Sequence, residues 1–172
     1  ILTYDSSRHH FREPKVIGNG LKIRDIAIVD NTVWCGTTTG LFKVNLQNLS
    51  SEMIPSYDIR AIYYSGDKLW LGTFGGGLNM LDPKDPKNEI KRVQTQQDIV
   101  LSIVGDGQNL WFSSESDITQ MNIETGEYYY YDALDAQRNT CFTEAHALRT
   151  RTGSILFGYS NGYCTFNPSK VT

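Results

Sequence analysis

The sequence predicts an all-β fold, a segment of a β-propeller with about four four-stranded antiparallel blades. The main observation is an internal repeat, in which three tryptophans stand in similar phrases and a fourth copy lacks the tryptophan. Trp34, Trp70, Trp111 and Leu156 follow one another at intervals of 36, 41 and 45 residues. Repeats near 40 residues are typical of propeller blades, with helical arrays as the main competitor. The phrases are Val33-Trp34-Cys35-Gly36-Thr37, Leu69-Trp70-Leu71-Gly72-Thr73, Leu110-Trp111-Phe112-Ser113-Ser114 and Ile155-Leu156-Phe157-Gly158-Tyr159.

Local patterning favours strands over helices in every copy. Residues 23–29 alternate in the period of two that marks a strand, and no segment shows a sustained apolar face at helical spacing. Turn-forming residues such as Gly and Asp predict a hairpin turn between the first and second strands of each copy. These turns are Asp30-Asn31, Gly66-Asp67, Gly105-Asp106-Gly107 and Thr152-Gly153. In the second copy we expect strands at about 59–65, 69–73, 77–82 and 90–95.

One such sheet has two faces to cover, and stacking the sheets face to face covers both. The small residues Gly36, Gly72 and Gly158 are expected to let neighbouring sheets approach closely near the axis. The tryptophans then fill the wider space between sheets further out.

The repeat also sets the expected domain organisation, a single propeller fragment over 1–172. The blades span about 20–56, 57–97, 98–134 and 143–168, and 1–19 supplies an outer strand at His10-Phe11-Arg12 to a preceding or closing blade. Four blades can close, but uniform copies also suit a slice of a larger ring. A slice exposes two sheet faces, so we expect homodimer formation or self-association through them.

Composition narrows the function classes. The 172 residues carry a net charge of -3, whereas nucleic-acid-binding proteins usually show a basic surplus. No apolar run approaches the length that crosses a bilayer, so membrane association is expected only through a part of the parent chain outside this sequence. Three cysteines without CxxC spacing predict free thiols, and a Cys141–Cys164 bridge is left open if the chain is exported.

The second copy resembles the two-component regulator propeller repeat. The likeness lies in Arg60-Ala61-Ile62 and in the run from Asp67 to Asn79, DKLWLGTFGGGLN. The last copy, with Asn161-Gly162-Tyr163 and Phe166-Asn167-Pro168, looks like the final blade of such sensors. The third copy departs from the pattern at Ser113 and lacks the glycine triplet.

The resemblance implies a C-terminal part of a propeller from the periplasmic sensor region of a Bacteroidetes-type hybrid histidine kinase. Many such sensors recognise oligosaccharides, so an oligosaccharide is the expected partner. The kinase chemistry would lie elsewhere in the parent protein, and this segment is expected to be non-catalytic, without cofactor or metal.

A ligand site in a propeller usually lies at the mouth of the axial channel, near the start of each first strand. The position ten residues before each tryptophan is polar or variable while its neighbours are apolar, and it is occupied by Arg24, Arg60, Leu101 and His146. Arginine donates paired hydrogen bonds to sugar hydroxyls or carboxylates, although a structural ion pair is the competing interpretation.

Further candidates surround this column. Phe74 and Tyr159 are expected at matching loop positions after the second strand, where an aromatic ring can stack on a sugar or anchor the loop. Asp58 and Asp98 lie near the starts of first strands, as candidate paired carboxylates or solvated turn acids. Asn139 lies in the longest connection, and long connections often carry function. The Tyr128–Tyr131 run is expected to pack between blades, with a sugar-stacking or dimer surface as the alternative.

Two rival functions remain open at this point. A propeller scaffold that binds proteins and no small molecule is the first, and a propeller lyase or glycoside hydrolase is the second. The sequence has no HExxH, GxSxG, GxxxxGK or CxxC motif. Gly75-Gly76-Gly77 is followed by neither a helix nor Lys-Ser/Thr, so it predicts a strand-to-strand turn and not a phosphate loop.

Overall fold

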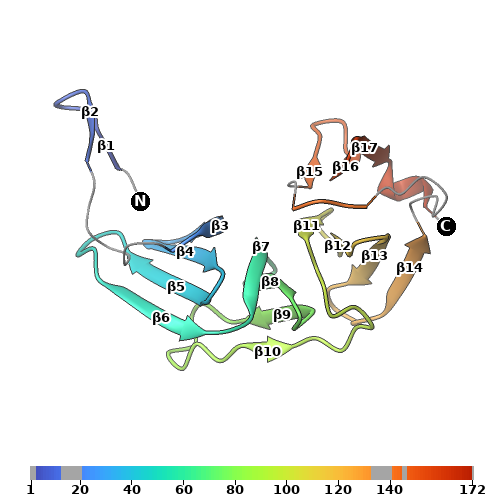
Figure 1. Cartoon of the computed structure of the whole chain (residues 1–172), viewed down its shortest axis with the longest axis horizontal. Helices are drawn as coiled ribbons and strands as arrows, with labels where there is room; N and C mark the ends of the chain where they lie inside the picture. Colours follow the sequence, from blue (N-terminus) through green and yellow to red (C-terminus); the bar gives the residue numbers. More distant parts are fainter. Residues whose placement is uncertain (1–2, 13–20, 133–140, 145–146, 172) are drawn as a thin grey trace.

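The computed structural model describes residues 3–12, 21–132, 141–144 and 147–171 (Figure 1). It confirms the all-β fold with consecutive antiparallel sheets. The first sheet contains β3 (Ile23–Val29), β4 (Thr32–Thr37), β5 (Gly40–Asn45) and β6 (Ser51–Pro55). The second contains β7 (Asp58–Ser65), β8 (Lys68–Phe74), β9 (Leu78–Leu81) and β10 (Lys91–Arg92). The third contains β11 (Ser102–Gly105), β12 (Asn109–Ser113), β13 (Asp117–Asn122) and β14 (Tyr128–Asp132).

The fourth sheet has three strands in the described residues, β15 (Leu148–Arg149), β16 (Ile155–Tyr159) and β17 (Gly162–Phe166), followed by a 3₁₀ turn at Pro168–Lys170. The strand expected at His10–Arg12 is present as β2. It pairs with β1 (Thr3–Asp5), which the sequence analysis did not predict. This hairpin stands apart from the four sheets (Figure 1).

The four sheets follow one another along an arc, with their first strands toward a common centre and β6, β10 and β14 at the periphery (Figure 1). Along the inside of the arc, β3 contacts β7, β7 contacts β11, and β11 contacts β15. Each sheet is a meander in which sequential strands are neighbours. The starts of the first strands, where the candidate site residues were expected, therefore meet on the inner side of the arc.

Apolar seams, defined here as the contacts between neighbouring sheets, form the core. Trp34 and Trp111 are each 1% exposed, and Trp70 is also buried. Trp34 packs in the first seam with Ile59 and Leu71, on β7 and β8 of the second sheet. Because no tryptophan-bearing face could be buried by its own sheet alone, this packing confirms the predicted stacking of sheets.

Glycine is required where the inner strands approach most closely. A Cβ placed on Gly36 would lie 2.5 Å from Ile59 Cγ2, and one on Gly72 would lie 2.7 Å from Val100 Cγ1. Real Cβ atoms do not reach such distances without displacement of their neighbours. The third sheet has Ser113 at this position, and its hydroxyl lies 2.8 Å from the Ser102 hydroxyl of the neighbouring strand.

The glycine triplet forms the expected turn between strands. The backbone N–H groups of Gly75 and Gly77 both donate to the carbonyl oxygen of Asp98, at 2.8 Å each. Gly77 has a φ of 67°, which side-chain-bearing residues seldom adopt. The triplet thus ties the second sheet to the start of the third.

The tyrosine run packs mainly into two seams, as predicted. Tyr131 stacks on Trp111 with ring centroids 5.9 Å apart, on the side of the fourth sheet. Tyr128 packs against the core between the second and third sheets and meets Tyr130 edge-on at 5.3 Å. Tyr129 alone of the four is exposed.

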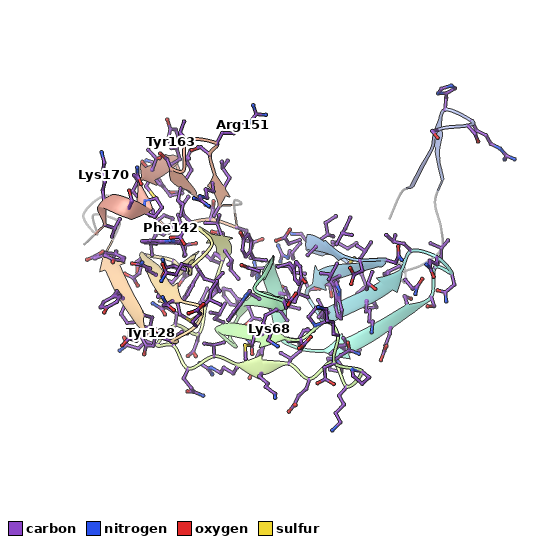
Figure 2. The ribbon with its side chains drawn as sticks, turned by 180° about the vertical axis from the view of Figure 1, so that it is seen from behind. Lys68, Tyr128, Phe142, Arg151, Tyr163 and Lys170 are labelled. Atoms are coloured by element: carbon purple, nitrogen blue, oxygen red, sulfur yellow. The ribbon has the colours of Figure 1, made fainter. Side chains whose placement is uncertain are left out.

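The two outermost sheet faces carry exposed apolar side chains. Ile28 on the first sheet is 62% exposed, and Tyr163 on the fourth is 64% exposed, with Ile26, Met53 and Leu148 also open. Tyr163 lies at the end of the arc away from the third sheet (Figure 2). These faces are the ones that a slice of a ring is expected to expose.

All three cysteines are free thiols, so the structure does not form the Cys141–Cys164 bridge that the sequence left open. Burial raises the pKa of the Cys35 thiol to about 11. Burial likewise raises the pKa of Cys164. Cys141 is exposed.

Candidate functional site

Backbone bulges hold the two arginines of the predicted specificity column. The pairing of β3 with β4 shifts register between Ile23 and Asp25, and that of β7 with β8 shifts between Ile59 and Ala61. Arg24 and Arg60 are therefore the extra residues of equivalent bulges in successive sheets. A bulge leaves its extra residue out of the ladder and re-aims its side chain.

The two bulges bring four charged side chains together, and we call Arg24, Asp58, Arg60 and Glu144 the mouth cluster. Glu144 bridges both arginines, receiving a hydrogen bond from Arg24 Nη1 at 2.5 Å and another from Arg60 Nη1. Asp58 Oδ2 lies 2.7 Å from Arg60 Nη2 and 3.8 Å from Arg24 Nη2. The cluster joins the first sheet, the second sheet and the segment that leads into the fourth.

Hydrogen bonding in the mouth cluster is incomplete. Arg24 Nε, Arg60 Nε and Asp58 Oδ1 are buried, and none has a hydrogen-bond partner among the described residues. Buried polar atoms without partners are rare, because each forfeits its hydration. Such atoms mark a place where a further polar group, from water or a ligand, would be stabilised.

A cavity of about 430 Å³ adjoins the cluster. The side chains around it combine aromatic, aliphatic and charged groups: Arg60, Phe74, Leu101, Glu115, Phe142, Thr143 and Glu144. The guanidinium of Arg60 lies 4.8 Å from the centre of the half-exposed Phe74 ring. A cavity with apolar walls and a few convergent polar groups is the usual form of a small-molecule site.

The structure unites part of the predicted site. Arg24, Arg60, Asp58 and Phe74 lie at the cluster or the cavity, as does Leu101 of the same column. Phe74 is the last residue of β8 and Tyr159 the last of β16, so neither stands in a loop. Tyr159 packs against the core between the third and fourth sheets.

Asp98 forms an ion pair with a different arginine from the two that Asp58 contacts. Its carboxylate pairs with Arg92 Nη2 at 2.5 Å and is largely exposed, while Asp58 is engaged with Arg24 and Arg60. The positions of His146 and Asn139 lie outside the described residues. Within the described segments, no group of three or more His, Cys, Asp or Glu residues could hold a metal ion.

Sequence reasoning missed Glu144, the residue that closes the cluster. One signal could have found it: Glu144 precedes Leu156 by the same twelve residues by which Asp58 precedes Trp70. The two carboxylates thus occupy equivalent positions of the repeat. Glu115 and Phe142 were also missed, because no motif of the repeat distinguishes them.

Comparison with known proteins shows that this fold occurs in extracellular domains of two-component systems. The chain aligns along 99% of its length with the extracellular domain of the BT4673 system of B. thetaiotaomicron, with a TM-score of 0.80 and 20% identity. That domain is described in one structure as part of a one-component system and in another as part of a hybrid two-component system. The extracellular domain of the hybrid two-component system BT3049 aligns with a TM-score of 0.65 and 18% identity.

A sequence relative points the same way. The chain is 24% identical over 158 residues to Histidine kinase P4 of Formosa agariphila, covering 81% of this chain. It spans only 11% of that kinase and 24% of the BT4673 domain. The chain matches no family model.

These relatives agree with the resemblance to two-component sensor regions that the repeat indicated. The structural neighbours are extracellular domains, and in the described part of the chain no helix is long and apolar enough to cross a membrane. At these identities the structural likeness establishes the fold, and the sensor role is taken up below as a proposal.

Proposed function

We propose that this chain is part of the periplasmic sensor region of a two-component histidine kinase and that it binds a glycan-derived ligand at the mouth cluster and its cavity. The observation that carries the proposal is the pair of bulged arginines, Arg24 and Arg60, beside the half-exposed Phe74. Guanidinium groups donate to sugar oxygens, and an aromatic face packs against the C–H face of a sugar ring. Comparison with extracellular domains of two-component systems supports the setting.

The segment itself would be non-catalytic and would signal because ligand binding is coupled to an equilibrium between two arrangements of the sensor. A ligand shifts an equilibrium only by its difference in affinity for two states. The mouth cluster touches two sheets and the segment before the fourth, so a ligand bound there would favour one arrangement of these parts. The kinase activity would reside in the remainder of the parent protein.

The test is a thermal-shift and calorimetric screen of the chain against neutral and acidic oligosaccharides. We expect at least one to raise the melting temperature, and Arg60→Gln to abolish the shift. Arg92→Gln is the control, because Arg92 forms a more exposed ion pair with Asp98 and does not line the cavity. If no oligosaccharide shifts the melting temperature, or if Arg60→Gln leaves the shift intact, the proposal fails.

A second candidate function, a protein-interaction scaffold, rests on the exposed end faces. Ile28 and Tyr163 lie on opposite ends of the arc, and large exposed apolar patches often mark association sites. A second copy of the chain is the occupant we test first. Light scattering that gives a monomer at all concentrations, with Ile28→Lys unchanged, would contradict self-association.

A further inference from the structure

The mouth cluster contains an internal carboxylate that sits where a ligand carboxylate would bind. Resting on the function proposed above, we propose that the site selects acidic sugars, whose uronate carboxylate replaces Glu144 between Arg24 and Arg60. The proposal specifies the class of ligand and assigns Glu144 as the group that the ligand displaces.

Charge balance supports a single incoming negative charge. Two arginines face two carboxylates, so the cluster is neutral as it stands. Withdrawal of the Glu144 carboxylate would leave one net positive charge, held by side chains that are 14% and 12% exposed. A monoanionic group restores the balance and adds charge-assisted hydrogen bonds to the arginines. A neutral sugar would leave that positive charge unpaired.

Glu144 is the member of the cluster best suited to leave. Its side chain is 42% exposed, against 22% for Asp58. Asp58 is also held on β7, whereas Glu144 lies in the connection between β14 and β15, outside any strand. Displacing Glu144 therefore returns a half-exposed carboxylate to water and breaks no backbone ladder.

The two arginines carry hydrogen-bond donors that neither carboxylate of the cluster uses. Glu144 reaches each arginine through one nitrogen, Nη1, and Asp58 reaches Nη2, so both Nε atoms remain without partners. A polar ligand atom that reached either Nε would gain a hydrogen bond that neither Glu144 nor Asp58 makes.

The rest of the cavity suits a pyranose ring more than a bare organic acid. Phe74, Leu101 and Phe142 form apolar walls beside Arg60, and Thr143 adds a hydroxyl. Glu115 is exposed, so its repulsion of an acid is screened by solvent. We therefore place the ligand carboxylate at the arginines and its ring against the half-exposed Phe74.

The experiment uses isothermal titration of the 172-residue chain with trigalacturonic acid and with its methyl ester, a shape-matched neutral probe. We expect the acid to bind at least tenfold more tightly than the ester. We also expect Glu144→Gln to tighten binding of the acid about tenfold, because the internal competitor is weakened. Arg24→Gln and Arg60→Gln should each weaken acid binding at least tenfold, while Arg92→Gln should not. Raising the salt from low to high concentration should weaken only the acid.

Three results would overturn the inference. They are equal affinity for the acid and the ester, weaker acid binding by the Glu144→Gln variant than by wild type, and no acid binding by either of these two proteins. The proposed function fails separately. Neutral oligosaccharides that bind in an Arg60-dependent way would preserve ligand binding while refuting selection for acids. No binding of any sugar would remove both.

Discussion

The seams between sheets and the mouth cluster differ in how they treat the polar atoms that they bury. In the third sheet, Trp111 is 1% exposed and its indole N–H donates to Asp106 Oδ2 at 2.9 Å. At the inner strand ends, Arg24 and Arg60 are almost as well covered, yet their Nε atoms have no partner in the described residues. The seams thus pair most of what they bury, and the cluster does not.

This difference teaches where stability and binding reside. Apolar contacts and fully paired buried polar groups stabilise the fold. A partly exposed polar cluster with unused hydrogen-bond donors contributes little to the free energy of unfolding, and those donors remain able to bind a ligand. The separation is incomplete: Trp34 Nε1 is also buried without a partner, and Lys43 Nζ lies 5.5 Å from that ring.

Truncation of a seam tryptophan should have the largest effect. Trp111→Ala removes a buried ring that packs on Tyr131 and Phe166, and we expect a loss of about 3–5 kcal/mol in the free energy of unfolding. Urea denaturation measures it, with the exposed Tyr129→Ala in the same sheet as the control. Equal losses for the two variants would refute the role of the seam.

Loss of Asp106, which accepts the indole N–H of Trp111, should have the second-largest effect on stability. Burial raises the pKa of Asp106, but hydrogen bonds from Trp111 and Asn109 outweigh burial, so its pKa lies below its ordinary value. Asp106→Ala should cost about 1.5–3 kcal/mol at pH 7, since hydrogen bonds to a charged acceptor are lost. A lowered pKa in the folded state means that the stabilisation is present above the ordinary aspartate pKa and is lost as the pH falls through the folded value.

Denaturation at pH 7 and at pH 3 checks this sign. The difference between wild type and Asp106→Ala should shrink at the lower pH, whereas the exposed Glu124→Ala should cost little at pH 7. A difference that grows on acidification would contradict the assignment.

Closer packing tests the inner end of a seam. Gly36→Ala places a methyl group against Ile59 on the next sheet and should cost about 1–3 kcal/mol through overpacking. Gly162→Ala is the matched control, because the nearest atom to its added methyl is the hydroxyl end of Tyr159 at 3.0 Å. Comparable melting temperatures for the two variants would show that the first two sheets are not tightly apposed.

The mouth cluster should respond least. Glu144→Gln should change the free energy of unfolding by less than about 1 kcal/mol, because Glu144 is half-exposed and Asp58 still neutralises one arginine. Thermal denaturation without ligand measures this. A loss above about 2 kcal/mol would make the cluster a stabilising element comparable with the seams.

Much of the fold followed from local features of the chain. In the second copy the expected strands lie within one or two residues of β7 and β8, and β9 and β10 fall inside the expected ranges. Alternation and turn residues specify strands over short distances, so these elements were accessible. The strand β1 could not be predicted, because its three residues are too few to show an alternation of apolar and polar side chains.

The candidate site was predicted only in part. The repeat alignment singled out Arg24 and Arg60, since they are polar among apolar neighbours, and Asp58 and Phe74 beside them. It did not reveal that both arginines are bulged, because a bulge depends on how two strands pair. The alignment also did not reveal that Tyr159 packs in a seam. Where the end of β16 points depends on how the third and fourth sheets stack.

The amino-acid sequence by itself determined the repeat, the strand pattern, the glycines of close approach and the tryptophans of the seams. Each depends on a period or a turn that a few consecutive residues encode. Only the tertiary structure decided that Glu144 meets Arg24 across 120 residues of chain and that two guanidinium groups share its carboxylate. Such a meeting depends on how successive sheets stack along the arc, and no local pattern specifies that geometry.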